Sequence, residues 1–232
     1  MMPEEKMLHA EISSYISTLL RTNFGKGPTS VYVSVNRPYI TVHFRGFMAP
    51  MEAILMKQNE SKRILETRDL MMNNLRHEIK LQFLKIADLD VKDIYADWDL
   101  ENKTGMIIAI LDEKPSAKFE WPDSVNQKVF EEKIDLASLK AEKIPEKTES
   151  FWLNDRTILV KRSGILVRIE KELIRNGFIE ELKVTKRPLE RQVMREVQME
   201  SVLKRTVSEI FVDWNFDEDI SYIAFMLEPK SL

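Results

Sequence analysis

Glycine, lysine and threonine gather in the run Gly25-Lys26-Gly27-Pro28-Thr29, a composition that could bind an anion. Glycine amides and a lysine ammonium can surround a phosphate or a carboxylate. The spacing departs from that of a phosphate-binding loop, Gly-x-x-x-x-Gly-Lys-[Ser/Thr], because Lys26 is followed here by Gly27. The run therefore predicts a turn that ends a helix, and the alternative is an anion or partner contact made by Gly25, Lys26, Gly27, Thr29 and Arg45.

Alternating carboxylates in Asp97-Trp98-Asp99-Leu100-Glu101 resemble the start of a calcium-binding loop. Such a loop needs a glycine at its sixth position and a glutamate at its twelfth, where this chain has Asn102 and Ile108. The alternation is instead typical of a half-buried strand. We therefore expect Trp98, and Trp214 in the similar run 210–216, to be structural residues packed in a core.

Metal binding and nucleophilic catalysis have no local support in the sequence. The three histidines lie on separate predicted elements without ligand spacing, cysteine is absent, and no Gly-x-Ser-x-Gly motif occurs. The sequence accordingly predicts no catalytic residue, no metal site and no cofactor, and it favours a protein that is not an enzyme.

The composition excludes several classes of protein. The chain has 232 residues, of which 44% are hydrophobic and 31% are charged, so it can bury a core and is neither collagen-like nor largely disordered. Its net charge of −3 disfavours nucleic acid as a partner. The longest uncharged apolar runs, 106–111 and 222–227, are too short to cross a bilayer, and residues 1–6 lack the cationic start of a signal peptide. We expect a cytoplasmic protein whose membrane contact, if any, is made through a partner.

The elements that would position these residues occur twice. Residues 94–100 match 210–216 at an offset of 116, while residues 39–42 match 157–160 at an offset of 118. Gly46 and Gly164 share the offset of 118, so both glycines are predicted structural positions. The chain is therefore predicted to be a divergent tandem repeat.

Each copy is predicted to run helix, strand, strand, helix, strand, strand. In the second copy the first helix is only weakly predicted, because the charged stretch 139–149 looks like a solvated connection. The expected fold is α+β, with two related αββαββ repeats that pack helices on antiparallel sheets in a pseudo-twofold arrangement. The expected repeats are residues 1–112 and 124–232, joined by a linker at 113–123 that contains two prolines.

The first copy resembles the MpsC-like family, formerly a domain of unknown function in bacteria. The resemblance rests on the order of its features: the glycine turn, a hairpin, the turn Phe44-Arg45-Gly46-Phe47-Met48, Glu52 and a long helix. The second copy lacks the glycine turn and resembles the family mainly from Asn154 onward. The name of the family is associated with a cation-translocating system that generates membrane potential. The resemblance implies a non-enzymatic accessory or regulatory protein, cytoplasmic or peripheral to the membrane, whose protein partners are subunits of such a transport system or a second copy of itself. The alternative is a sensor that binds a small molecule or an anion at the turn 25–29 and in a cleft between the repeats.

Overall fold

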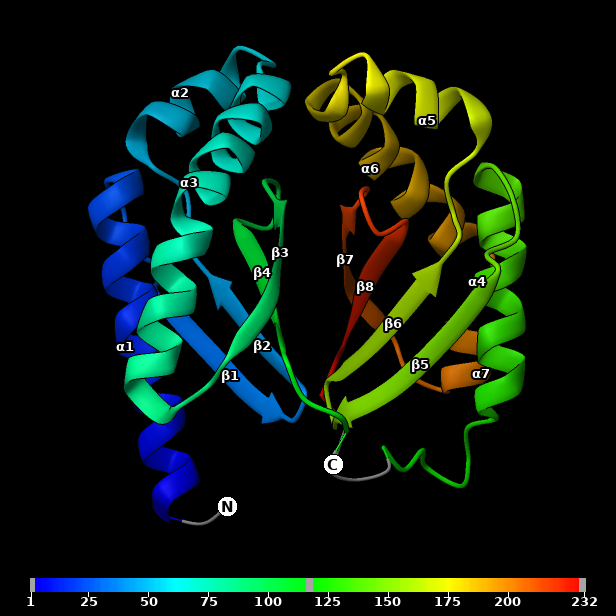
Figure 1. The fold of residues 1–232 in the computed structure, drawn as a ribbon, viewed down its shortest axis with the longest axis horizontal. Coiled ribbons are helices and arrows are strands. Elements are labelled where there is room, and N and C mark those ends of the chain that lie inside the picture. Colours follow the sequence, from blue (N-terminus) through cyan, green and yellow to red (C-terminus); the bar gives the residue numbers. More distant parts are fainter. Residues whose placement is uncertain (1–2, 116–118, 230–232) are drawn as a thin grey trace. The chain divides into compact units, whose positions relative to one another are not determined.

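The computed structural model describes residues 3–115 and 119–229, which form two compact units that divide after residue 117 (Figure 1). Each unit contains one four-stranded antiparallel sheet with helices packed on it. The prediction of an α+β fold built from two related repeats is confirmed. The expected boundaries of the repeats and their pseudo-twofold arrangement stay predictions.

Unit 1 follows the predicted order of elements and contains α1 (Pro3–Phe24), β1 (Ser30–Asn36), β2 (Tyr39–Arg45), α2 (Pro50–Lys57), α3 (Ser61–Ala87), β3 (Val91–Asp99) and β4 (Thr104–Leu111). The strands are ordered β1-β2-β4-β3, so the two hairpins meet where β2 pairs with β4. Helices α1 and α3 pack on the sheet and against each other (Figure 1).

Unit 2 repeats this plan and contains α4 (Gln127–Ala141), β5 (Lys147–Asn154), β6 (Thr157–Ser163), α5 (Arg168–Arg175), α6 (Ile179–Glu196), α7 (Glu200–Leu203), β7 (Val207–Asn215) and β8 (Ile220–Leu227). The order β5-β6-β8-β7 is the same as in unit 1. One difference is that the long helix is interrupted. The helix α3 spans 27 residues, whereas α6 stops after 18 and a short α7 follows.

The first helix of each unit buries the same pattern of positions. In α1 the buried residues lie at four positions, Ile12, Ile16, Leu19 and Leu20. In α4 they lie 118 residues later, at Phe130, Ile134, Ala137 and Ser138. These spacings place all four side chains on one helix face, which packs into the core of its unit.

The structure corrects the sequence-based expectation for the start of the second copy. Residues 139–141 complete α4 and residues 147–149 begin β5, so only 142–146 connect the two elements. The helix forms because Asn126 caps it, its side chain accepting a hydrogen bond from the Val129 amide at 3.2 Å. The buried face of the helix lies before the charged stretch, at Phe130, Ile134, Ala137 and Ser138.

Candidate functional site

The predicted glycine turn lies directly after α1. Gly25 adopts a positive φ of 73°, a conformation that suits glycine and ends the helix. Lys26 is exposed, whereas Thr29 donates hydrogen bonds to the Arg45 carbonyl from both its amide, at 2.7 Å, and its hydroxyl, at 3.1 Å. Both donors of Thr29 therefore join the turn to the end of β2. A contact of Gly25, Lys26, Gly27, Thr29 and Arg45 with an anion or a partner stays a prediction.

Gly46 and Gly164 occupy equivalent turns with φ of 66° and 65°. A β-carbon on Gly46 would lie 2.3 Å from the Thr29 hydroxyl, and one on Gly164 would lie 2.4 Å from the carboxyl carbon of Glu146. Both the left-handed backbone and the lack of space require glycine at these positions. Each glycine leads the chain into the short helix that carries the charged site described next.

A buried ion pair joins α2 to α3 in unit 1. Arg68 Nε and Nη2 each donate to one oxygen of the Glu52 carboxylate, both at 2.7 Å, and the Arg68 side chain is fully buried. Glu52 Oε2 also accepts from the Ala49 amide at 2.7 Å, which caps the start of α2. This carboxylate thus holds both a helix end and a buried cation.

Aromatic rings surround the other sides of the Arg68 guanidinium. Its central carbon lies 4.6 Å from the centroid of Phe47 and 5.1 Å from that of Trp98, distances typical of cation–π contact. Phe24 and Phe44 complete the cluster, with centroids 5.9 Å and 5.7 Å from that of Trp98. We call Phe24, Phe44, Phe47 and Trp98 the aromatic cage of unit 1. The Arg68 guanidinium thus has one counterion and two π faces beside it, and no second charged side chain is needed to neutralise it.

Unit 2 places Lys186 and Glu170 where unit 1 has Arg68 and Glu52, again 118 residues later. Lys186 Nζ lies 2.7 Å from Glu170 Oε1, and Glu170 Oε2 accepts from the Val167 amide at 3.0 Å. Lys186 also donates to Glu142 and lies 3.8 Å from Glu190 Oε1. The buried cation and the helix-capping glutamate are therefore common to both units, but the surroundings of the cation differ.

The aromatic and apolar surroundings of unit 1 are replaced in unit 2 by ionisable and hydroxyl groups. The sheet register shows this directly, because Phe44 pairs with Gly105 in unit 1 and Arg162 pairs with Ser221 in unit 2. The offset of 118 residues also relates Phe24 to Glu142, Met72 to Glu190 and Leu20 to Ser138. We call Glu142, Arg162, Glu170, Lys186 and Glu190 the ionic cluster of unit 2.

Arg162 and Glu190 form the second buried pair of this ionic cluster. Arg162 Nη1 and Nη2 donate to the two Glu190 oxygens at 3.0 Å and 2.9 Å, which is a bidentate geometry. Arg162 donates further to the hydroxyls of Ser221 and Ser138, each at 2.9 Å. Four hydrogen bonds thus compensate the loss of water around a guanidinium that is 1% exposed.

The environment of Glu142 strongly favours its protonated form. Burial has the largest effect, a hydrogen bond to Glu170 acts in the same direction and Lys186 opposes both, so that the pKa of Glu142 is raised from 4.5 to about 7. The ionic cluster therefore contains a carboxyl group that can bind or release a proton near neutral pH.

The two tryptophans lie at equivalent buried positions, but their indole N–H groups differ. Trp98 Nε1 donates to Asp69 Oδ1 at 3.2 Å. The residue that corresponds to Asp69 in unit 2 is Arg187, whose guanidinium offers no acceptor. Trp214 Nε1 is buried and has no hydrogen-bond partner within residues 3–115 and 119–229.

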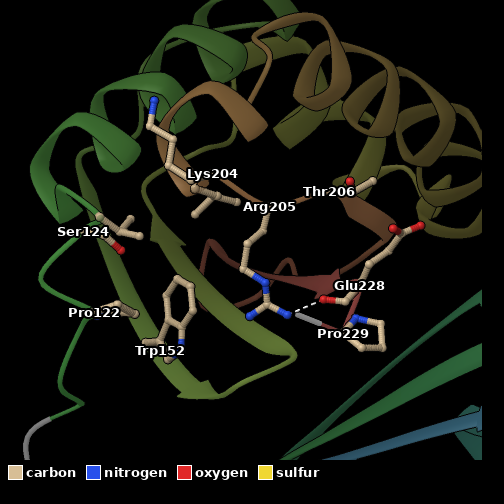
Figure 2. A pocket seen from close by; sticks show the side chains of 10 residues that line it. Pro122, Ser124, Trp152, Lys204, Arg205, Thr206, Glu228 and Pro229 are labelled. Atoms are coloured by element: carbon tan, nitrogen blue, oxygen red, sulfur yellow. Dashed lines mark hydrogen bonds between the residues drawn. The ribbon is translucent and has the colours of Figure 1, made fainter. Parts of the chain in front are cut away.

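A pocket of about 450 Å³ lies in unit 2, a volume within the range that fits small molecules (Figure 2). It is lined by Trp152 of β5, by Pro122, Ser124 and Val125, by residues 203–206 before β7, and by Glu228 and Pro229 after β8. The guanidinium of Arg205 donates to the carbonyls of Asp155 and Glu228, so it joins the ends of neighbouring strands. None of the sequence-predicted site residues lines this pocket.

Within 3–115 and 119–229, histidine, aspartate and glutamate side chains form no group of three that could hold a metal ion. Over the same residues, no helix has the length and apolarity required to span a bilayer.

The sequence did not lead us to the buried cations Arg68 and Lys186 or to the ionic cluster. The sequence does contain a sign of these residues, because at the offset of 118 Lys186 corresponds to Arg68 and Glu142 corresponds to Phe24. Where one copy has an aromatic residue in its core and the other has a charged residue, a buried counterion is expected in the second copy.

Comparison with known proteins agrees with this internal duplication. The family model described as "Na+-translocating membrane potential-generating system (MpsC)" matches the chain twice, over residues 4–113 and 123–229. No curated protein and no solved structure matches the chain. Since the two matches together span most of the sequence and coincide with two units of the same topology, the chain belongs to the MpsC family and carries its domain in tandem.

Proposed function

We propose that this protein is a non-enzymatic accessory or regulatory component of a membrane cation-transport system that generates membrane potential. It acts in the cytoplasm and reaches the membrane through a protein partner. The observation that carries the proposal is the match of both units to the MpsC family, whose description names a Na+-translocating system.

The conserved and divergent features of the two units support a binding role. Both units keep the sheet, the glutamate-capped short helix and the buried cation, which preserves the scaffold. The units differ in three features. Unit 2 has the ionic cluster and an interrupted long helix, and only unit 1 has the glycine turn. Two similar scaffolds with different details can present two different surfaces to the subunits of a complex.

The test is recovery of partners from native cells. The full chain would be tagged, crosslinked in cells and purified from detergent-solubilised membranes, and the partners would be identified by mass spectrometry. Integral membrane subunits of a cation transporter are the expected partners. Enrichment of no such subunit under several growth conditions would contradict the transport link.

A surface variant sharpens the same experiment. Lys26→Glu reverses the charge of the exposed glycine turn, where a partner contact is predicted, and Lys85→Glu makes the same change at an exposed position of α3 as the matched control. Loss of the membrane partners with Lys26→Glu alone is the result expected if the turn makes the contact. Equal recovery with both variants places the contact elsewhere on the chain.

A further inference from the structure

The charges of the ionic cluster in unit 2 do not balance. Its three carboxylates come from the residue after α4 (Glu142), from α5 (Glu170) and from α6 (Glu190). Its two cations come from β6 (Arg162) and α6 (Lys186), and both side chains are at most 2% exposed. When all five groups are ionised, this buried cluster carries one negative charge in excess.

The geometry assigns the excess charge to one pair of carboxyl groups. Arg162 is bonded to both oxygens of Glu190, so that pair is self-compensating. Lys186 remains, and it donates to Glu142 and to Glu170. Two carboxylates that share one ammonium in a buried place repel each other, and the repulsion is relieved when one of them takes up a proton.

We propose that Glu142 and Glu170 form a proton-binding site, in which one proton shared by the two carboxyl groups joins the end of α4 to α5. The groups that face this site are Lys186 and Glu190 from α6 and Arg162 from β6, and together they leave it short of one positive charge. Burial and the hydrogen bond between the two carboxyl groups raise the pKa of Glu142 to about 7, in agreement with the geometry. The site is independent of the proposed link to transport.

Unit 1 lacks two of the carboxyl groups that form the ionic cluster of unit 2. Phe24 stands where unit 2 has Glu142, and Met72 stands where it has Glu190. The buried cation there, Arg68, therefore meets Glu52 and aromatic rings, and the pair is neutral without a proton. The replacement of Phe24 by a carboxyl group is the step that creates a titrating site.

Release of the proton has a mechanical consequence. Glu142 follows the last residue of α4 and begins the connection 142–146 that leads into β5. With both carboxylates charged, the repulsion pushes Glu142 away from Glu170, and the connection loses its bond to α5. The site thus couples a change of pH near neutrality to the junction of α4, α5 and β5.

The experiment is a pH titration of the full chain labelled with ¹³C at the glutamate carboxyl carbons and followed by NMR. Glu142→Gln assigns the signal and keeps an amide that can donate to Glu170, while Glu132→Gln, at an exposed position of α4, is the matched control. We expect the Glu142 carbon to titrate with a midpoint near 7, and we expect the signal to persist in Glu132→Gln and vanish in Glu142→Gln. A Glu142 midpoint below about 5, the range of ordinary glutamates, would overturn the proposal.

A second variant separates proton sharing from simple burial. Glu170→Gln removes the like charge but leaves Glu142 equally buried, so the midpoint of Glu142 is expected to fall by about 1 pH unit or more. An unchanged midpoint in Glu170→Gln would show that the two carboxyl groups do not share the proton. If Glu142→Gln does not fold, Glu142→Phe, which restores the residue type of unit 1, serves for the assignment.

Discussion

The guanidinium of Arg68 and the carboxylate of Glu52 form a bidentate pair inside unit 1, with both donor–acceptor distances at 2.7 Å. The same carboxylate caps α2 through the Ala49 amide. One glutamate therefore fixes the start of one helix and neutralises a buried charge on the next. The equivalent pair of Glu170 and Lys186 does the same in unit 2.

Breaking the pair in unit 1 is expected to be costly. Glu52→Gln leaves the Arg68 charge buried without its counterion, so we expect a loss of roughly 3 to 5 kcal/mol in the free energy of unfolding. Urea denaturation of the full chain, followed by circular dichroism, measures this loss. Lys62→Ala, which removes an exposed pair with Glu66, is the control and is expected to cost less than about 1 kcal/mol. Similar small losses for both variants would contradict a structural role of the buried pair.

The two tryptophans are expected to respond differently to a conservative change. Trp98→Phe removes the hydrogen bond to Asp69, whereas Trp214→Phe removes an indole N–H that has no partner within the described residues. Trp98→Phe is therefore expected to cost about 1 kcal/mol more than Trp214→Phe. Truncation to alanine is expected to cost roughly 3 to 5 kcal/mol at either position. Thermal and urea unfolding of the four variants would test this, and equal costs for both phenylalanine variants would show that the Asp69 bond has no net effect.

Gly105 and Ser221 are expected not to be interchangeable. A β-carbon on Gly105 would lie 2.4 Å from Phe44 Cζ, so Gly105→Ser should destabilise unit 1 by about 1 to 3 kcal/mol. The double variant Phe44→Leu/Gly105→Ser frees the space, and part of the loss should be regained. Failure of Phe44→Leu to offset the loss, in a double-mutant cycle, would show that the clash is not the cause.

Ser221→Gly tests the matching position in unit 2. It removes the hydroxyl that accepts from Arg162 Nε at 2.9 Å, and a buried guanidinium N–H without its acceptor costs about 1 to 3 kcal/mol. Urea denaturation measures the loss, and Ser201→Gly, at an exposed position of α7, is the control. A stability equal to that of the parent chain would mean that Arg162 finds another acceptor.

Stability is expected to depend on pH through Glu142. Its pKa is raised from 4.5 to about 7 in the folded chain, so the folded state binds the proton more tightly than the unfolded state does. The stabilisation is fully present below pH 4.5, declines as the pH rises from 4.5 to about 7, and is absent above that range. Measured as the difference between the parent chain and Glu142→Gln, the free energy of unfolding should fall across this window. A difference that is constant with pH, or one that rises, would contradict the predicted direction.

The sequence predicted the elements whose apolar residues recur regularly. Ile12, Ile16 and Leu20 have the spacing of one helix face and lie in α1, and the matched runs 94–100 and 210–216 predicted strands where β3 and β7 lie. The start of unit 2 was underestimated because Ala137 and Ser138 are small or polar, although they fill the buried positions of Leu19 and Leu20. The buried Ser138 hydroxyl is satisfied there because it donates to the Ile134 carbonyl and accepts from Arg162, which is distant in the sequence.

The ionic cluster could not be predicted by reading one copy alone. Charged residues are usually exposed, so the residue types of Glu142, Lys186 and Glu190 do not predict that they lie in a core. Their burial depends on contacts between α4, α5, α6 and β6, which only the tertiary structure supplies. Comparison of the two copies position by position was the additional information that the sequence contained.

The interruption of the long helix in unit 2 changed more than its length. The offset between the copies falls from 118 at Lys186 to 116 at Trp214, so unit 2 is two residues shorter than unit 1 in the region where α6 ends and α7 begins. Residues 203–206, which follow the break, form one wall of the pocket at Trp152. The chain that follows the break thus supplies part of a concave surface, and a homologue whose corresponding helix is continuous is expected to lack that wall.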